Sequence, residues 1–283
     1  MTSPMPDSDS PVDQERRFGG LARLYGPEAP GRLRQARVAV VGLGGVGSWT
    51  AEALARCGVG ALTLVDLDHV AESNVNRQLH ALTSTLGAAK VDAMAERVLG
   101  INPDCAVTRV DDFVAPDNVR ALLAPELDAV IDCTDQAAAK IAMIVQARAR
   151  GQALVVCGGA GGKTDPLALR AGDLSQSTHD ALLAKLRHAL RRNHGFPKPS
   201  GTPGKPPARI PKMGVRVLWV AQQAILPAAW TGQHEAEDDV GVQAPGPAPQ
   251  GLSCAGYGSV VTVTAAMGLA AANEAIARIL AGR

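Results

Sequence analysis

Short apolar runs alternate with longer amphipathic stretches through the first 157 residues of the chain. The runs are rich in Val, Leu, Ile and Ala, and polar or glycine-rich segments follow them. This alternation predicts strands joined by helices, and hence an α/β fold with a Rossmann-like, doubly wound, mostly parallel sheet. The predicted strands are 38–41, 62–65, 106–110, 129–132 and 154–157, and the predicted helices are 48–57, 88–99, 116–123 and 136–150.

The pattern is less regular in the second half of the chain. Residues 180–193 are predicted to form a helix, because four leucines fall on one face and most of the basic residues fall off it. The other expected elements are a strand from residue 167, a strand at 215–220, Pro/Gly-rich loops at 196–207 and 232–251, and a C-terminal extension of strand and helix at 260–280.

A glycine-rich turn joins the first predicted strand to the first predicted helix. It contains Gly42, Gly44, Gly45 and Gly47. Such a turn lets backbone N–H groups and the positive end of a helix approach a phosphate closely. The pattern alone is as compatible with NAD as with ATP.

Asp66 ends the second predicted strand, where a carboxylate can accept hydrogen bonds from ribose hydroxyls. Its alternative is a cap on the next segment, a role that Asp68 could take instead. We therefore treat both carboxylates as candidate nucleotide-binding residues. A short helix predicted within 16–34 is expected to pack beside this site.

Four further residues favour a triphosphate over a dinucleotide. Asn74, Arg77 and Gln78 can donate hydrogen bonds to phosphate oxygens, and Lys90 opens a predicted helix. By spacing alone, Lys90 could also be an ordinary solvated lysine. A hydride-transfer cofactor has no use for two more cations near its phosphates, so together these residues favour ATP.

Two carboxylates, Asp132 and Asp135, follow the fourth strand and are expected at the carboxyl edge of the sheet. A carboxylate there can hold Mg²⁺, which neutralises triphosphate oxygens. One of the two is expected to serve only as a helix N-cap.

Two other segments resemble functional motifs. Residues 157–164 resemble a P-loop, but Cys157 takes the first glycine position and Asp165-Pro166 follows at once, so we interpret them as a glycine turn lining the site. Cys254 lies among small residues and could be a nucleophile, although a lone loop cysteine is more often inert.

Composition and charge narrow the class of protein. Five scattered cysteines form no C-x-x-C pair, which argues against a zinc site and against a secreted disulfide scaffold. With no signal peptide recognised, a cytoplasmic location is expected. The uncharged stretch 256–272 gives only a weak indication of membrane association and is interpreted as a buried strand and helix.

The charge is unevenly distributed along the chain. The net charge is +1, yet residues 181–234 contain nine Lys or Arg and no acid. This basic stretch could bind along a nucleic-acid backbone, or it could be a solvated helix and linker.

Taken together, these segments resemble the ubiquitin-activating-enzyme-like (ThiF-type) adenylyltransferases, and within them the branch that acts on tRNA. The matching segments are 17–26, the turn 42–47, Asp66, 73–80, Lys90, 101–103, 111–113 and 158–162. Residues 1–15, dominated by Ser, Pro and Asp, are expected to form a disordered tail. The resemblance implies a single ATP-binding adenylation domain at 16–283, within which the basic stretch at about 181–214 is expected to be a mobile insert. It also assigns roles: Asp66 to the ribose, Arg77 and Lys90 to phosphates, and Asp135 to Mg²⁺. Arg23, or else Arg17, would reach the γ-phosphate in the partner of a homodimer.

The reaction that the resemblance implies is the ATP-dependent dehydration, or cyclisation, of N6-threonylcarbamoyladenosine beside the anticodon of tRNA, through an acyl-adenylate. It further implies a cysteine desulfurase and its sulfur-acceptor protein as partners, with Cys254 as the candidate sulfur acceptor. Two alternatives stay open. One is adenylation of the C-terminal glycine of a ubiquitin-like sulfur carrier, and the other is an NAD-binding oxidoreductase or a non-catalytic nucleotide-binding module.

Overall fold

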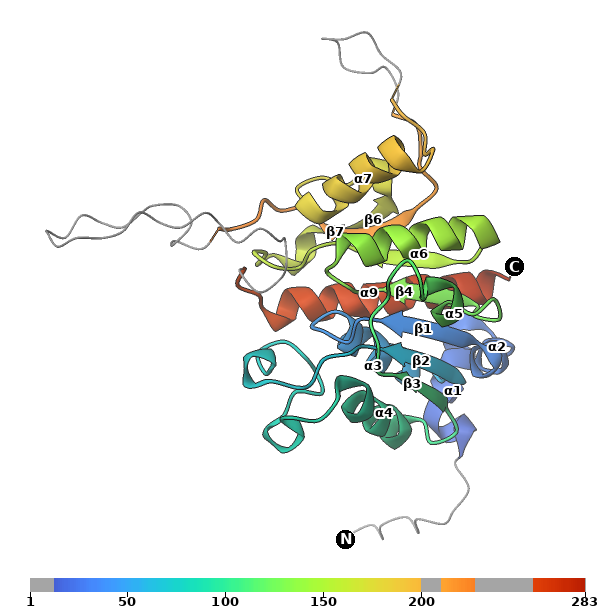
Figure 1. The fold of residues 1–283 in the computed structure, drawn as a ribbon. Coiled ribbons are helices and arrows are strands. Elements are labelled where there is room, and N and C mark those ends of the chain that lie inside the picture. The colour runs from blue at the N-terminus through green and yellow to red at the C-terminus, as the bar shows by residue number, and fades with distance from the viewer. Residues whose placement is uncertain (1–12, 200–209, 227–256, 283) are drawn as a thin grey trace, which may run out of the picture.

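A seven-stranded sheet forms the centre of the computed structural model, which describes residues 13–199, 210–226 and 257–282 (Figure 1). The strand order is β3-β2-β1-β4-β5-β7-β6, and every neighbouring pair is parallel except β6 with β7. The predicted α/β fold with a mostly parallel sheet is confirmed. The strands are β1 (Arg37–Val41), β2 (Ala61–Val65), β3 (Ala106–Val110), β4 (Ala129–Asp132), β5 (Leu154–Cys157), β6 (Leu169–Asp173) and β7 (Arg216–Val220).

Helices cover both faces of the sheet, which explains why its central strands are continuous apolar runs. All four residues of β4 and of β5 are buried, whereas the edge strand β3 has exposed positions. One core lies under α2 (Ala29–Gln35), α3 (Gly47–Arg56), α4 (Lys90–Ile101) and α9 (Val261–Ala281). The other lies under α5 (Val119–Leu122), α6 (Ala137–Arg150) and α7 (Ala181–Asn193).

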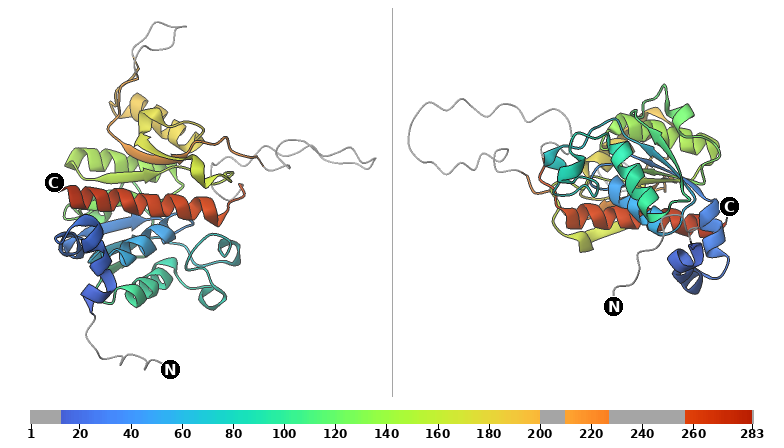
Figure 2. Two further views of the ribbon diagram at one scale, coloured as in Figure 1. Left: turned by 180° about the vertical axis from the view of Figure 1, so that it is seen from behind. Right: turned by 90° about the horizontal axis from the view of Figure 1, so that it is seen from below.

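The C-terminal segment is one helix, so the prediction of a strand followed by a helix was wrong. The place beside β5 where a further strand could pair is taken by β7. Helix α9 instead crosses the face of the sheet against α3, where a Cβ on Gly268 would lie 2.4 Å from the carbonyl oxygen of Val46 (Figure 2). Among the described helices, α9 is the one with the length and composition to cross a membrane. The face of α9 that carries Val263 and Met267 is buried in the core.

The N-terminal segment forms two helices, α1 (Gln14–Tyr25) and α2, where one short helix was predicted. Gly26, with a φ of 94°, and Pro27 separate them. The N–H of Gly60 donates to the carbonyl of Leu33 at 3.0 Å, which fixes α2 at the amino ends of the strands. The expectation that this segment packs beside the nucleotide site was therefore wrong. Because α1 begins at Gln14, residues 14 and 15 do not belong to the predicted disordered tail, whose first 12 residues lie outside the described part.

Helix α7 forms as predicted, with its four leucines buried. Residues 181–193 of the insert predicted at 181–214 are thus ordered in a helix. Phe196, which follows the helix, is buried, and the guanidinium of Arg148 lies 4.2 Å from the centre of the Phe196 ring. Arg187 donates to the carbonyls of Leu174 and Ser177. The start of the predicted mobile insert is therefore anchored, and residues 200–209 lie outside the described residues.

Candidate active site

A pocket of about 670 Å³ opens at the carboxyl ends of the central strands. It lies where the strand order reverses between β1 and β4, the topological switch point at which open α/β sheets bind ligands. Its walls come from the glycine turn after β1, the segment after β2, the start of α6, the turn after β5 and the start of α7. The sequence-predicted residues found in its lining are Gly42, Gly44, Gly45, Asp66, Asp68, Asn74, Arg77, Gln78, Lys90 and Asp135.

The glycines of the turn have different roles. A Cβ on Gly47 would lie 1.7 Å from the carbonyl oxygen of Gly42, so Gly47 is required by the chain's own packing and is not part of the pocket lining. Gly42 has a φ of 85° and contacts the backbone after β4 closely. A Cβ on Gly44 would meet nothing within 4 Å, so Gly44 presents open backbone to the pocket. The assignment of Gly47 to nucleotide binding is therefore corrected to a packing role.

Asp66 ties the glycine turn to the end of β2. Its Oδ2 accepts from the N–H of Leu43 at 2.5 Å, and its Oδ1 accepts from the N–H of Asp68 at 2.9 Å. Lys90 is no solvated surface lysine: its side chain is 6% exposed, and its Nζ lies 2.7 Å from Asp68 and 3.8 Å from Asp66. Asp68 itself is 74% exposed and caps neither neighbouring helix. One cation and two carboxylates thus stand together at this wall.

The segment after β2 is held against α3. The indole N–H of Trp49 donates to the carbonyl of Arg77 at 3.0 Å, and the Arg77 guanidinium donates to the carbonyl of Ser73 at 2.7 Å. Asn74 Oδ1 accepts from the N–H of Ala71, so that oxygen holds the local turn. Gln78 is 5% exposed, and its Oε1 has no hydrogen-bond partner among the described residues. A buried polar atom without a partner at a pocket wall is a candidate contact for a ligand.

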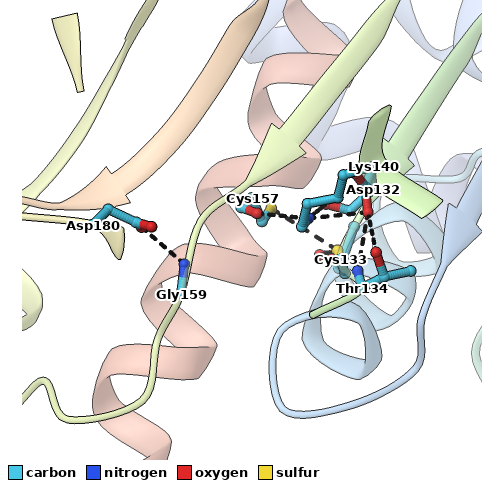
Figure 3. Close-up of polar contacts among 8 residues, drawn as sticks. Asp132, Cys133, Thr134, Lys140, Cys157, Gly159 and Asp180 are labelled. Atoms are coloured by element: carbon cyan, nitrogen blue, oxygen red, sulfur yellow. Dashed lines mark hydrogen bonds and ion pairs between the residues drawn. The ribbon is translucent and has the colours of Figure 1, made fainter. Parts of the chain in front are cut away.

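The two carboxylates after β4 have different environments, and Figure 3 shows that of Asp132. Asp132 is fully buried and lies outside the pocket lining; its Oδ1 is 3.1 Å from Lys140 Nζ and accepts from the Thr134 hydroxyl at 2.8 Å. Burial raises the pKa of Asp132, while Lys140 and Thr134 oppose that rise. The structure therefore corrects the prediction that Asp132 contacts nucleotide, because strand alternation turns it toward α6. It caps no helix either, since Gln136 is the N-cap of α6.

Asp135 lies in the pocket lining, two residues before α6. The described residues contain no group of three or more His, Cys, Asp or Glu that could hold a metal. Mg²⁺ does not need such a group, because it is usually bound through one or two carboxylates together with substrate phosphates and water. Asp135 in the lining of this pocket fits that donor set, and its metal role stays a prediction.

The sequence did not predict the wall of the pocket that faces Lys90, which is formed by the turn after β5 and the start of α7. Asp180 caps α7 with Oδ1, and its Oδ2 accepts from the N–H of Gly159 at 2.9 Å (Figure 3). Burial raises the pKa of this carboxyl. Lys163, also buried, donates to the carbonyl of His179 at 2.7 Å and to that of Gln222. The leucine pattern after Asp180 is enough to predict the start of a helix there. It does not predict that Asp180 contacts Gly159, in a turn 21 residues earlier in the chain.

The turn after β5 lines the pocket as predicted, and it is not a P-loop. The segment that follows is a 3-10 turn at Pro166–Ala168 and then β6, with no long helix. Its glycines serve close packing: a Cβ on Gly158 would lie 2.1 Å from Asp180 Oδ2, and one on Gly161 would lie 2.9 Å from Tyr257 Cβ.

Arg23, a further predicted site residue, does not line this pocket. Arg23 is exposed on α1, at the amino ends of the strands, and lines a separate cleft with Phe18 and Arg34. Cys254 lies outside the described residues, so its role as sulfur acceptor, and the cysteine desulfurase partner with it, stay predictions.

His80, close to Lys90, predicts an acid sensitivity of the fold. It is buried, neither ring nitrogen has a partner among the described residues, and burial together with the charges of Lys90 and Arg97 lowers its pKa from 6.5 to about 4. Between pH 7 and pH 5 the unfolded chain therefore takes up a proton that the folded chain does not, and stability falls as the pH falls. The loss from this group should be roughly 2 kcal/mol.

Urea unfolding at both pH values measures this effect. His80→Leu should lose less stability than the wild type over the same pH interval, by roughly 2 kcal/mol. The exposed His188 offers a matched control, His188→Leu. Equal losses in wild type and His80→Leu would contradict the prediction.

With this geometry in place, comparison with known proteins identifies the family. A model of the ThiF family matches residues 20–282. The chain belongs to the ThiF family. This ThiF-family chain is 41% identical over 268 residues to the tRNA threonylcarbamoyladenosine dehydratase of Escherichia coli, with 94% of each chain covered. It is 38% identical to the protein of the same name from Haemophilus influenzae, again with 94% of each covered.

A solved structure extends the similarity to the whole fold. The E. coli tRNA N6-threonylcarbamoyladenosine dehydratase in complex with ATP superposes with a TM-score of 0.79 at 39% identity, covering 95% of this chain and 96% of the other. This ThiF-family protein therefore shares its fold, over nearly all of both chains, with a relative crystallised with ATP.

Proposed function

We propose that the protein catalyses the ATP-dependent dehydration of N6-threonylcarbamoyladenosine in tRNA, through an acyl-adenylate. The observation that carries this proposal is the gathering of Asp66, Arg77, Lys90 and Asp135 around one pocket. Its support from comparison is the 94% mutual coverage with the E. coli dehydratase. Because the proposed substrate is tRNA, a cytoplasmic location follows from the same proposal.

The reaction has two steps. The threonyl carboxylate attacks the α-phosphorus of ATP and expels pyrophosphate. The carbamoyl group of the same nucleoside then attacks the activated carbonyl carbon, and AMP leaves with the carboxylate oxygen, so that the nucleoside loses one water overall. Intramolecular attack carries an effective molarity on the order of 10⁵ M or more, so the protein's main task in the second step is orientation.

The residues of the pocket supply orientation and charge. Asp66 would accept from the ribose hydroxyls, and the open backbone at Gly44 would lie along the phosphates. Arg77, Lys90 and the side-chain N–H of Gln78 would donate to phosphate oxygens. Arg77 and Lys90 would thereby place positive charge where pyrophosphate departs. Asp135 would hold Mg²⁺, whose chemistry there is neutralisation of phosphate charge.

The decisive experiment incubates the protein with ATP, Mg²⁺ and threonylcarbamoylated tRNA, followed by mass spectrometry of the nucleosides. Loss of one water from the modified adenosine, with one AMP formed per nucleoside, is expected. The same tRNA without the modification is the control and should yield no AMP. ATP–pyrophosphate exchange driven by a ubiquitin-like carrier, with no change in the nucleoside, would instead favour the sulfur-carrier alternative.

A basic surface on α7 and the residues after it is proposed to bind tRNA. Lys185, Arg192 and Lys198 are exposed there, whereas Arg191 is half-buried and donates to the carbonyl of Pro197. Changing the three exposed residues to Gln should weaken tRNA binding. It should also reduce the log–log salt slope by roughly 0.7 to 0.9 for each lost phosphate contact.

ATP affinity should be unchanged in this triple variant, because none of the three residues lines the pocket. Arg16, Arg109 and Arg278 are exposed on other elements and provide a charge-matched control triple. If both triples alter the salt slope equally, the α7 surface has no special role in tRNA binding.

A homodimer is proposed to complete the site. Arg23 lies at the opposite edge of its own subunit from the pocket, so it could act on phosphate only in a partner subunit. Arg23→Ala and Asp135→Asn subunits should each be inactive alone, and a mixture should recover up to about one quarter of wild-type activity through hybrid sites. Activity of the mixture is compared with each variant alone; no recovery would place Arg23 outside the catalytic machinery.

A further inference from the structure

Two cysteines stand side by side beneath the nucleotide pocket. Cys157 ends β5, and Cys133 directly follows β4, one position beyond the register pair Asp132 and Val156. Their Sγ atoms are 3.9 Å apart (Figure 3). Cys133 lines the pocket, whereas Cys157 is fully buried. The two other cysteines in the described part of the chain are Cys57, directly after α3, and Cys105, directly before β3.

The backbone places this pair within range of a covalent bond. Neighbouring strands lie about 4.8 Å apart, which falls inside the range of about 4.4–6.8 Å between Cα atoms of disulfides. A disulfide has an S–S length of about 2.05 Å, so the two sulfurs would have to approach each other by nearly 2 Å. Both residues stand at strand ends, where a backbone shift breaks few ladder hydrogen bonds.

We propose that Cys133 and Cys157 are an oxidisable thiol pair, and that a peroxide converts them to a disulfide that disables the nucleotide pocket. Cys133 is the attacking thiol, because it faces the pocket from which an oxidant arrives. Its thiolate attacks one peroxide oxygen, the O–O bond breaks, and a sulfenic acid and hydroxide form. The Cys157 sulfur then displaces the hydroxyl group as the disulfide forms. Two thiols lose two electrons and two protons in all, and hydrogen peroxide becomes two waters.

The order of the two steps agrees with the environments of the sulfurs. A hydrogen bond with Cys133 and complete burial raise the pKa of the Cys157 thiol well above its usual value. Cys157 is therefore the poorer first nucleophile, and it reacts only with the sulfenic acid that forms next to it.

The disulfide would change the shape of the pocket by displacing the backbone. The main chain of Cys133 and Thr134 lies within 3.1 Å of the Cβ position of Gly42, and the Cys133 N–H donates to the carbonyl of Val41 at 2.8 Å. Asp135 follows two residues later in the same segment. Pulling Cys133 toward β5 would therefore displace both the glycine turn and Asp135. This effect on the pocket rests on the proposed function, whereas the thiol chemistry does not.

The experiment treats the full-length Cys254→Ser variant with equimolar hydrogen peroxide and maps its cysteine-containing peptides by mass spectrometry. A Cys133–Cys157 cross-linked peptide is expected, together with at least a tenfold loss of ATP affinity that dithiothreitol reverses. Saturating ATP should slow the oxidation, because bound nucleotide covers Cys133. In a Cys157→Ser background, peroxide should leave a dimedone-reactive sulfenic acid on Cys133. The matched control Cys57→Ser should behave like its parent.

Free thiols at both positions after peroxide treatment would overturn the proposal, and so would a mapped disulfide with unchanged ATP affinity. If the reduced protein binds no ATP, the proposed function fails, and peptide mapping still decides whether the disulfide forms.

Discussion

Replacing Asp135 with Asn is expected to lower turnover by about 10²- to 10⁴-fold while ATP still binds. An amide is a poorer Mg²⁺ ligand than a carboxylate, and metal neutralisation of phosphate charge is worth several kcal/mol in the transition state. The ground-state contacts proposed for ATP with the glycine turn, Asp66 and Lys90 would remain in the variant, because these residues are unchanged pocket-lining residues. The loss should therefore appear in kcat more than in ATP affinity.

Nucleoside mass spectrometry gives kcat, and calorimetric titration gives the Kd for ATP. Asp117→Asn is a matched control, because Asp117 is exposed and outside the pocket lining. Wild-type turnover by Asp135→Asn would assign the metal to another residue. A large rise in the Kd for ATP with unchanged kcat would give Asp135 a role in ground-state binding instead.

Lys140→Met is expected to destabilise the fold by about 3–5 kcal/mol, the usual cost of removing one partner from a buried ion pair. The ammonium group is fully buried, 3.1 Å from Asp132 Oδ1, and it also donates to the carbonyl of Cys157 at 2.8 Å. Its removal leaves a buried carboxylate and a buried carbonyl without this donor. Asp132 must then protonate or remain charged in an apolar environment, and both states cost stability.

Urea unfolding at pH 7 measures the loss, and Lys185→Met on the exposed side of α7 is the control. Adding Asp132→Asn to Lys140→Met should recover part of the lost stability, because the double variant no longer buries an unpaired charge. A loss below about 1 kcal/mol in Lys140→Met would show that water or a local rearrangement replaces the ammonium group.

The parts of the site that could be predicted are those set by local sequence. The continuous apolar runs identified β1, β4 and β5, since strands covered on both faces need no alternation. Gly42, Gly44, Gly45, Asp66 and Lys90 were assigned to one site because each follows or opens an element at the same edge of a parallel sheet. These inferences depend on short stretches of chain and on a rule of topology.

The parts that failed depend on contacts between distant segments. Asp132 and Asp135 are equivalent by sequence, and only Lys140, reaching back from α6, shows that Asp132 is structural. The N-terminal segment was expected as one short helix beside the site, yet the position of α2 follows from main-chain hydrogen bonds to the start of β2. In the same way, Asp180 belongs to the pocket because it contacts Gly159, which no periodicity in the sequence reveals.

The crossing of α9 over α3 has a consequence for synthesis on the ribosome. Gly268 contacts the backbone of Val46, and Thr264 lines the pocket against Gly45, so the glycine turn near residue 45 is supported by a helix that is translated more than 200 residues later. Pairings of such long range form late, because loop closure must precede them. A nascent chain that has exposed every strand but not α9 would therefore lack a finished phosphate cradle. We therefore expect nucleotide binding only after α9 has left the exit tunnel, so that ATP would not assist the early steps of folding.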